Sequence, residues 1–385
     1  MVNAIILAGG FGTRLRPLSC TIPKPMFPIL NRPLLSYIIS RMIKEIHGLE
    51  KIVIAVNYRA NDIKAYMDEW QKILNVDIII NEERRPLGTG GAVRYSKNIL
   101  DGEQFFMLNG DVLSFFSYQD MIRFHESKES MATISAIHVK DVSRYGVVVA
   151  NDNGLITEFY EKPNTPELKE KYGIRPINAG TYLLEPEIFD IIPPHKKVSI
   201  EKEVFPRLVM KRKAFKYEYE GLWKDLGLPE DYLEGNFMIL DLEQENHEDG
   251  SIMSETAVIC ESTDIIPPVC IADGVKIGKD CEIGPYAIIG EDCEIGDGVK
   301  MKELVLFDNC LIDNFASIEH AILGANVKIG KWARIHGPGI FGSNVCVSKN
   351  VTLMGSKEHP IKVCPWKTIT RESLEAIVSN PMFFH

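Results

Sequence analysis

The stretch that decides the fold is Asn3-Ala4-Ile5-Ile6-Leu7-Ala8-Gly9-Gly10-Phe11-Gly12-Thr13-Arg14-Leu15, followed downstream by Pro23-Lys24-Pro25. The apolar run from Ala4 to Ala8 is short and has no polar alternation, which is typical of a strand buried on both faces of a sheet. The glycines that follow allow a sharp turn, and their backbone N–H groups can approach a ligand closely. Cations come next. A buried strand, glycine amides and cations in this order predict a site for a polyphosphate.

The chain continues with a β-α-β-α-β order. Residues 51–56 and 76–80 have the composition of buried strands, and residues 33–46 and 61–74 have apolar side chains at helical spacing. We therefore predict an α/β fold with a Rossmann-like, mostly parallel sheet that binds ligands at the carboxyl ends of its strands. The glycine spacing fits neither G-x-x-x-x-G-K-[ST] nor G-x-G-x-x-G, so a P-loop and a dinucleotide-binding loop are both excluded.

A six-residue repeat occupies the last third of the chain and predicts a left-handed parallel β-helix of hexapeptide repeats. Its phase slips through residues 301–322 and then resumes. We expect a first domain at 1–240, a linker at 241–256, and the β-helix with a C-terminal tail at 257–385. The apolar positions of the repeat are Ile265, Ile271, Ile277, Ile283, Ile289, Ile295, then Leu323, Ile329, Ile335, Phe341, Val347 and Leu353.

Composition narrows the class of protein. The net charge is −10 at pH 7, which argues against a nucleic-acid surface. No apolar stretch has membrane-spanning length, and the N-terminus lacks the pattern of a secretory leader. The eight cysteines form no C-x-x-C pair, so we interpret them as small buried residues of a cytoplasmic protein rather than as disulfide or zinc ligands.

The opening string, together with Pro23-Lys24-Pro25, resembles the signature of the sugar-1-phosphate nucleotidylyltransferases, G-G-x-G-T-R-L-x-P-L with P-K-P downstream. Residues 329–335 and 365–369 are similar to the β-helix of the mannose-1-phosphate guanylyltransferases within that family. The resemblance covers nearly the whole chain. It implies an enzyme that transfers a nucleotidyl group from a nucleoside triphosphate to a sugar 1-phosphate and releases pyrophosphate.

The resemblance also implies the residues of the site. Arg14 would grip the β- and γ-phosphates and Lys24 would neutralise the α-phosphate. Asp111, in Leu-Asn-Gly-Asp, and Asp225, in Trp-x-Asp-x-Gly, would hold Mg²⁺ between them. Lys162 would hold the phosphate of the incoming sugar, beside Gly146, Glu161 and Asn178. The nucleotide would contact Leu7, Ala8, Gly9, Gly10, Gly12, Thr13, Glu83, Pro86, Gly88 and Thr89.

Glu83 bears on the choice of base, because the relatives read the base edge at this position. A carboxylate only accepts hydrogen bonds, and the Watson–Crick edge of guanine offers two adjacent donors. Thymine and uracil suit an amide side chain better, so Glu83 favours GTP. The other interpretation is that Glu83 is solvated and a backbone group reads the base. The glycines at 88, 90 and 91 are expected to present bare amides to the same crevice.

Three alternatives stay open. The nucleotide could be UTP, dTTP or ATP and the sugar glucose or an amino sugar. The chain could be a non-catalytic regulatory subunit that senses a nucleotide sugar, although such subunits usually lose the catalytic cations that this chain keeps. Hexapeptide repeats also occur in acyltransferases, for which His320 or His336 would be the base. The exposed ends of the β-helix further predict a homo-oligomer.

Overall fold

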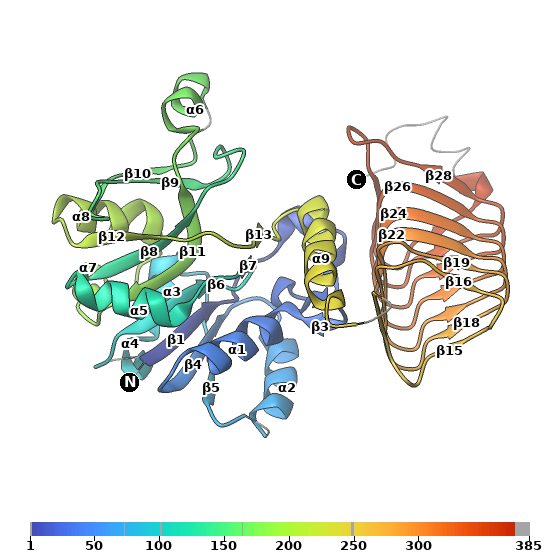
Figure 1. The fold of residues 1–385 in the computed structure, drawn as a ribbon, viewed down its shortest axis with the longest axis horizontal. Helices are drawn as coiled ribbons and strands as arrows, with labels where there is room; N and C mark the ends of the chain where they lie inside the picture. The colour runs from blue at the N-terminus through green and yellow to red at the C-terminus, as the bar shows by residue number, and fades with distance from the viewer. Residues whose placement is uncertain (1, 73, 101, 164, 248–249, 374–385) are drawn as a thin grey trace. The chain divides into compact units, whose positions relative to one another are not determined.

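The computed structural model describes residues 2–72, 74–100, 102–163, 165–247 and 250–373 (Figure 1). The chain forms two compact units. The first combines the chain up to Phe11 with Leu34–Asp225, and the second combines Gly12–Pro33 with the chain from Leu226 onward. The glycine-rich loop therefore starts in the first unit and continues in the second. The predicted domain boundaries stay a prediction, and the predicted tail beyond residue 373 lies outside the described residues.

The first unit contains a nine-stranded sheet in which four neighbouring strands at one end are parallel. Strand β1 (Val2–Leu7) lies between β4 (Leu49–Val56) and β6 (Phe105–Asn109), and β4 pairs in turn with β5 (Asp77–Glu82). Helices α1 (Leu34–Glu45) and α2 (Ala60–Gln71) make the connections. The predicted β-α-β-α-β order is confirmed. Helix α2 begins at Ala60, one residue before the predicted range, and has Arg59 at its N-cap.

The remaining strands of this sheet run in mixed directions. Strand β11 (Ile177–Leu184) is antiparallel to β6 and to β8 (Ala132–Ile137), and β12 (Ala214–Glu218) pairs with β8. Strands β9 (Gly146–Ala150) and β10 (Ile156–Glu161) form a hairpin whose turn contains Asn151-Asp152-Asn153-Gly154, residue types that favour tight turns. A further two-stranded ladder joins β7 (Val112–Ser114) to β13 (Trp223–Asp225).

Both faces of the sheet are covered, because successive side chains of a strand point to opposite faces. On one face, Ile5 and Met107 share a core with α3 (Gly88–Tyr95) and α8 (Phe205–Met210). On the other face, the ring of Phe106 meets Tyr118 of α5 (Tyr118–Ser127) edge to face at 5.2 Å. A π-helical turn at Ile200–Val204 precedes α8, and Ser199 caps it by accepting from the backbone N–H of Lys202. Three short helices complete this unit: α4 (Lys97–Leu100), α6 (Pro166–Tyr172) and α7 (Ile188–Ile191).

The second unit is the predicted parallel β-helix. Its strands stack in parallel into a ten-stranded and a seven-stranded sheet (Figure 1). Helix α9 (Pro229–Gln244) leads into it, so a helix occupies the first residues of the predicted linker. Two short strands, β2 (Pro28–Ile29) and β3 (Arg32–Pro33), also belong to this unit. The β-helix strands are β14 (Ser251–Met253), β15 (Val258–Ile259), β16 (Asp264–Ile265), β17 (Val269–Ile271), β18 (Lys276–Ile277), β19 (Glu282–Ile283), β20 (Ala287–Ile289), β21 (Glu294–Ile295), β22 (Lys300–Leu306), β23 (Leu311–Ile312), β24 (Ser317–Leu323), β25 (Lys328–Ile329), β26 (Arg334–Phe341), β27 (Cys346–Val347), β28 (Thr352–Met354), β29 (Ile361–Val363) and β30 (Thr368–Ile369).

The slip of the hexapeptide phase has a structural cause. Ile265 pairs with Ile283, so the first turns of the β-helix are 18 residues long. Met301 pairs with Ile318, so the following turns are one residue shorter. The missing residue falls at a corner of the β-helix, where Glu303 and His320 adopt positive φ. Strands β22 and β24 continue through this corner from one side of the β-helix to the next without interruption.

All eight cysteines are free thiols, and four of them are buried, two half-buried and two exposed. Cys281, Cys293 and Cys310 lie buried in the core of the β-helix, where a small apolar side chain fits. The expectation that all eight are buried is wrong for Cys20 and Cys364, which are exposed. Within the described parts of the chain, no helix is both long and apolar enough to cross a membrane.

Candidate active site

Three strand ends of the first unit meet at one edge of the sheet. The backbone N–H of Ala8 donates to Ala55 O (2.8 Å), and that of Gly110 donates to Leu7 O (3.0 Å). A Cβ on Gly110 would lie 2.7 Å from Leu7 O, so only glycine lets the chain turn here and present Asp111 next to the end of β1. On the other side of β1, the N–H of Glu83 donates to Val56 O (2.8 Å) at the end of β4.

The two predicted metal aspartates are brought together by the β7–β13 ladder. In this antiparallel pair Asp225 lies opposite Val112, the residue that directly follows Asp111. The side chain of Asp225 is only 14% exposed. Residues more than 100 positions apart in the chain thus supply two carboxylates to one end of a short ladder. Among the described residues, no group of three or more His, Cys, Asp or Glu side chains could hold a metal, so the protein offers a pair of carboxylates only.

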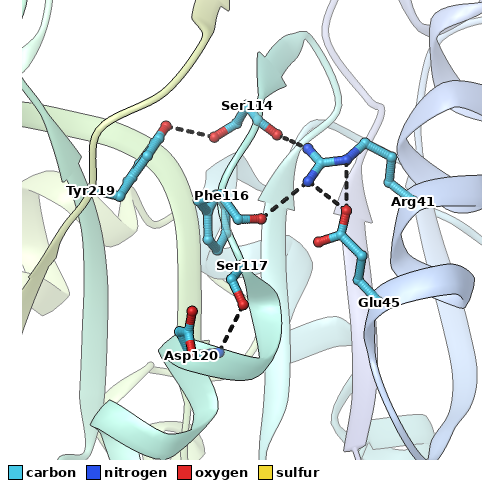
Figure 2. Close-up of polar contacts among 7 residues, drawn as sticks. All are labelled: Arg41, Glu45, Ser114, Phe116, Ser117, Asp120 and Tyr219. Atoms are coloured by element: carbon cyan, nitrogen blue, oxygen red, sulfur yellow. Dashed lines mark hydrogen bonds and ion pairs between the residues drawn. The ribbon is translucent and has the colours of Figure 1, made fainter.

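Arg41 of α1 holds the other end of this ladder and was not singled out by the sequence (Figure 2). Its guanidinium donates to the carbonyls of Ser114 and Phe116 and forms an ion pair with Glu45 (2.7 Å). The hydroxyls of Ser114 and Tyr219 are 2.7 Å apart. Arginine suits this role because its fork of N–H donors can bond several acceptors at once. Arg41 is therefore a positioning residue for β7, and no local sequence signal marks it.

Two more residues that contact β13 were not singled out by the sequence. A guanidinium nitrogen of Arg144 lies 3.8 Å from a carboxylate oxygen of Asp225. The ring of Tyr145 meets Trp223 edge to face at 5.0 Å, and the Trp223 indole N–H donates to Ala179 O (2.9 Å). Arg144 and Tyr145 directly precede Gly146, so their position beside a predicted site residue was the available signal.

The predicted sugar-phosphate residues gather on β9, β10 and β11. Glu161 lies opposite Gly146 in the β9–β10 ladder, and a Cβ on Gly146 would be 2.8 Å from a Glu161 carboxylate oxygen. Burial raises the pKa of Glu161, and the ammonium of Lys162, 3.6 Å away, opposes this. Asn178 accepts from Gly180 N–H and donates to the Tyr182 hydroxyl (2.7 Å). Its amide therefore already has two partners and keeps one further N–H and one lone pair.

Glu83 is buried, with 7% of the residue exposed, and its side chain bonds the backbone of the loop that follows it. One carboxylate oxygen accepts from the backbone N–H of Leu87 (2.9 Å), and its backbone carbonyl accepts from the Asn57 side chain (2.9 Å). Burial raises the pKa of Glu83, while the hydrogen bond from Leu87 lowers it. The expectation that Glu83 is solvated, which the alternative interpretation required, is therefore wrong.

The glycines of the following turn have a packing role. The N–H groups of Gly90 and Gly91 both donate to Val198 O, so the expectation of bare amides is wrong for these two residues. Gly88 has φ +73°, and a Cβ there would lie 2.5 Å from the same carbonyl. The hydroxyl of Thr89 donates to Glu201 and accepts from Ile200 N–H. The turn is thus built to pack against residues 196–200, which no glycine spacing reveals.

The cationic part of the glycine-rich loop lies in the second unit. Gly12 has φ +60°, and its missing Cβ would lie 3.2 Å from Ser19 and 3.6 Å from Lys24, so the loop folds back upon itself here. The Ser19 hydroxyl donates to Gly12 O (2.7 Å). Lys24 is 7% exposed, whereas Thr13 and Arg14 are exposed. In the first unit a Cβ on Gly10 would meet nothing within 4 Å, so the fold itself does not require that glycine.

Helix α9 and the β-helix contact the chain on both sides of Lys24. The Phe27 ring packs against Tyr232 of α9 (5.5 Å) and against Phe307 of the β-helix (6.1 Å). The Asn31 amide donates to Ile289 O (3.0 Å), and the hydroxyls of Thr21 and Ser343 are 2.9 Å apart. Segments more than 200 residues apart therefore determine the course of the loop that carries Lys24.

Comparison with known proteins identifies the family. The nucleotidyl transferase family matches residues 3–241, and the GMPPB C-terminal domain matches residues 265–378. The chain is 35% identical to the mannose-1-phosphate guanylyltransferase catalytic subunit beta of Dictyostelium discoideum, over 96% of this chain and 97% of that protein. It is also 35% identical to the mannose-1-phosphate guanyltransferase of Schizosaccharomyces pombe, over 94% and 96%. The chain belongs to the mannose-1-phosphate guanylyltransferase family.

A solved structure agrees with this assignment for the first part of the chain. HddC from Yersinia pseudotuberculosis, crystallised in complex with GMP-PN, is 30% identical and has a TM-score of 0.51; it covers 62% of this chain, and the match spans 100% of HddC. The predicted fold class and the predicted class of enzyme, a nucleotidyltransferase, are confirmed by these comparisons.

Mannose-1-phosphate guanylyltransferases, as nucleotidyltransferases, generally use a divalent metal ion. The residues of this chain fit such an ion, because the β7–β13 register brings Asp225 opposite the residue that follows Asp111, so two residues with hard carboxylate oxygens lie at the same end of one ladder. A small divalent cation that keeps several waters and takes its other ligands from phosphates needs no more than this from the protein.

The two histidines considered for a second activity both face carboxylates. His320 Nδ1 lies 3.3 Å from Glu303, and His336 Nδ1 lies 3.1 Å from Glu319. Each pair joins adjacent turns of the β-helix. Contacts of this kind are typical of surface ladders between parallel strands.

Proposed function

We propose that the protein transfers a GMP group from GTP to mannose 1-phosphate, giving GDP-mannose and pyrophosphate. The observation that carries the proposal is the similarity to guanylyltransferases over more than nine-tenths of both chains. It is supported by a buried, acceptor-only side chain at the position expected to read the base. The substrates are the nucleoside triphosphate and the sugar 1-phosphate.

Catalysis by this site consists of positioning and charge neutralisation. An oxygen of the sugar phosphate attacks the α-phosphorus, and the bond to the departing pyrophosphate breaks, so no covalent enzyme intermediate is needed. Lys162 holds the attacking phosphate, Lys24 neutralises the α-phosphate and Arg14 grips the β- and γ-phosphates. Asp111 and Asp225 would hold Mg²⁺, which would offset further negative charge on the phosphates.

The base is selected by what Glu83 can accept. With one oxygen occupied by Leu87 N–H, the second oxygen of Glu83 remains to accept from guanine N1–H or from the exocyclic amino group. Against uracil or thymine the same oxygen would face carbonyl acceptors on either side of the single N3–H. A buried carboxylate left beside an acceptor costs about 1–3 kcal/mol, which corresponds to roughly tenfold to a hundredfold in selectivity.

Glu83→Gln tests this selection. The amide oxygen of glutamine can still accept from Leu87 N–H, so the loop should keep its shape, while the second acceptor becomes an NH₂ donor. We expect the ratio of kcat/KM for GTP over UTP to fall by about tenfold or more. The Glu82→Gln variant, at the exposed neighbour, is the matched control and should keep the ratio of the unmodified protein. Equal ratios in all three proteins would rule out Glu83 as the base reader.

A pyrophosphate-release assay tests the function as a whole. GTP, UTP, dTTP and ATP are each combined with mannose, glucose and glucosamine 1-phosphates. The fastest release is expected with GTP and mannose 1-phosphate. Faster turnover with another pair would favour the alternative substrates. No release with any pair, from folded protein, would favour a non-catalytic regulatory subunit.

Two further properties remain proposals. We place the protein in the cytoplasm, supported by eight free cysteines, two of them exposed, which an oxidising compartment would tend to pair. We also expect a homo-oligomer that forms through the β-helix, because the end turns of such a helix present unpaired strand edges. Light scattering of the purified protein measures the latter directly.

A further inference from the structure

A cavity, which we call the α3 cavity, lies in the first unit beside the loop that carries Glu83. Its volume is about 530 Å³. It is formed by the loop before α3, the last turn of α3, the start of α4 and residues 194–196. None of the residues assigned to the nucleotide, the sugar phosphate or the metal ion is among its described lining, although Arg84, Arg85 and Leu87 are close to Glu83 in the sequence. The lining comprises Arg84, Arg85, Leu87, Gly91, Arg94, Tyr95, Lys97, Asn98, Pro194, His195 and Lys196.

The α3 cavity is strongly cationic. Its walls hold five arginine or lysine side chains and one histidine, and its described lining includes no carboxylate. Within the described parts of the chain, none of these five cations takes part in an ion pair. The chain as a whole carries a net charge of −10, so this concentration of positive charge runs against its composition. Like charges gathered in one concave wall repel one another and attract an anion from solution.

Several of these cations are held in place without being neutralised. An Arg85 Nη donates to His195 O (3.2 Å), and an Arg94 Nη donates to Phe189 O (3.0 Å). The Lys97 ammonium lies 5.8 Å from the centre of the Phe189 ring. A guanidinium has five N–H groups, so each arginine keeps donors for a ligand after bonding one carbonyl. Backbone carbonyls and a ring face orient these groups and leave their charge available, which favours tight binding of a multivalent anion.

We propose that the α3 cavity is an accessory binding site for a nucleoside diphosphate. The two phosphates of such a ligand are negatively charged, so the five cations of the cavity would attract them. Tyr95, 48% exposed in the wall of the cavity, offers a ring on which a base can stack. The volume is in the range that holds a small organic ligand.

A ligand in the α3 cavity would touch the loop that closes around Glu83. Arg84 and Arg85 follow Glu83 directly, and Leu87, which lines the cavity, donates its N–H to the Glu83 carboxylate. The accessory site stands without the proposed function. An effect of the accessory ligand on base selection does rest on the proposed function, because it assumes that Glu83 reads the base.

The test is the number of GDP molecules bound per chain, measured by equilibrium dialysis with labelled GDP. The double variant Arg84→Gln/Lys196→Gln removes two exposed cations from the wall of the cavity. It should bind one GDP fewer per chain than the unmodified protein, through a loss of affinity of about a hundredfold at this site. The double variant Lys44→Gln/Lys64→Gln removes the same charge from exposed positions of α1 and α2 and should bind as many as the unmodified protein.

The outcomes separate this proposal from the proposed function. If the active site did not bind a guanine nucleotide, the unmodified protein would bind one GDP per chain and the Arg84→Gln/Lys196→Gln variant would bind none. The two proteins would still differ by one GDP per chain. Equal binding by the two double variants would overturn the accessory site. Tyr95→Ala should weaken GDP, and not inorganic pyrophosphate, at this site. Unchanged GDP binding by Tyr95→Ala would overturn the nucleotide assignment in favour of an inorganic phosphate ligand.

Discussion

Asp111→Asn should lower kcat for pyrophosphate release by about a thousandfold, and Asp225→Asn should do nearly the same. Asparagine keeps the shape of the side chain and removes the charge, so the turn at Gly110 and the β7–β13 ladder should survive. The protein would then hold a divalent ion through a single carboxylate. Because the two aspartates lie at one end of the same ladder and act as a unit, the double variant should lose little more than either single variant.

The control for this prediction is Asp152→Asn, at an exposed position of the turn between β9 and β10. It should retain full activity. A titration of activity with Mg²⁺ gives a second readout, because loss of a ligand raises the concentration needed for half-maximal rate. Normal turnover by Asp111→Asn at low Mg²⁺ would show that these carboxylates do not hold the ion.

Lys24→Ala and Arg14→Ala should each lower kcat/KM by about a hundredfold to a thousandfold. In the proposed mechanism both cations face negative charge that increases or departs during the reaction, so their loss should weaken binding of the transition state. Lys24 is nearly buried beside Gly12, and a buried cation interacts with phosphate more strongly than an exposed one. Its replacement should therefore be the more harmful of the two.

The matched control is Arg16→Ala, an exposed arginine of the same loop to which no role is assigned. It should stay within about threefold of the unmodified protein, the range of a typical surface substitution. Thermal melting should separate folding from chemistry, because Arg14 is exposed and its variant should melt normally. A loss of activity in Arg16→Ala equal to that in Arg14→Ala would point to a general effect of charge rather than to phosphate contacts.

Much of the architecture could be predicted from local patterns. The apolar runs, their glycine ends and the six-residue period are properties of neighbouring residues, so they can be read from a sequence directly. The one-residue slip near 301–322 was visible as an irregularity. Its cause, a corner at Glu303 and His320 through which the strands continue, required the structure.

The candidate site was predictable only as far as its motifs reach. Asp111 and Asp225 were recognisable from short strings, but the ladder that places them together depends on Arg41, which no motif contains. The glycines at 90 and 91 looked like ligand-binding amides and instead bond Val198. Sequence patterns report which backbone groups are available and do not report which other part of the chain will use them.

The sequence by itself determined the class of fold, the repeat and the identity of the charged residues, because periodicity and residue type are local properties. The tertiary structure alone decided which of these residues become neighbours. Arg85 and His195, 110 positions apart, meet in the wall of the α3 cavity, and Phe27 packs against Phe307 beside the loop that carries Lys24. Such contacts depend on how whole strands and helices pack, and packing is a property of the folded chain as a whole.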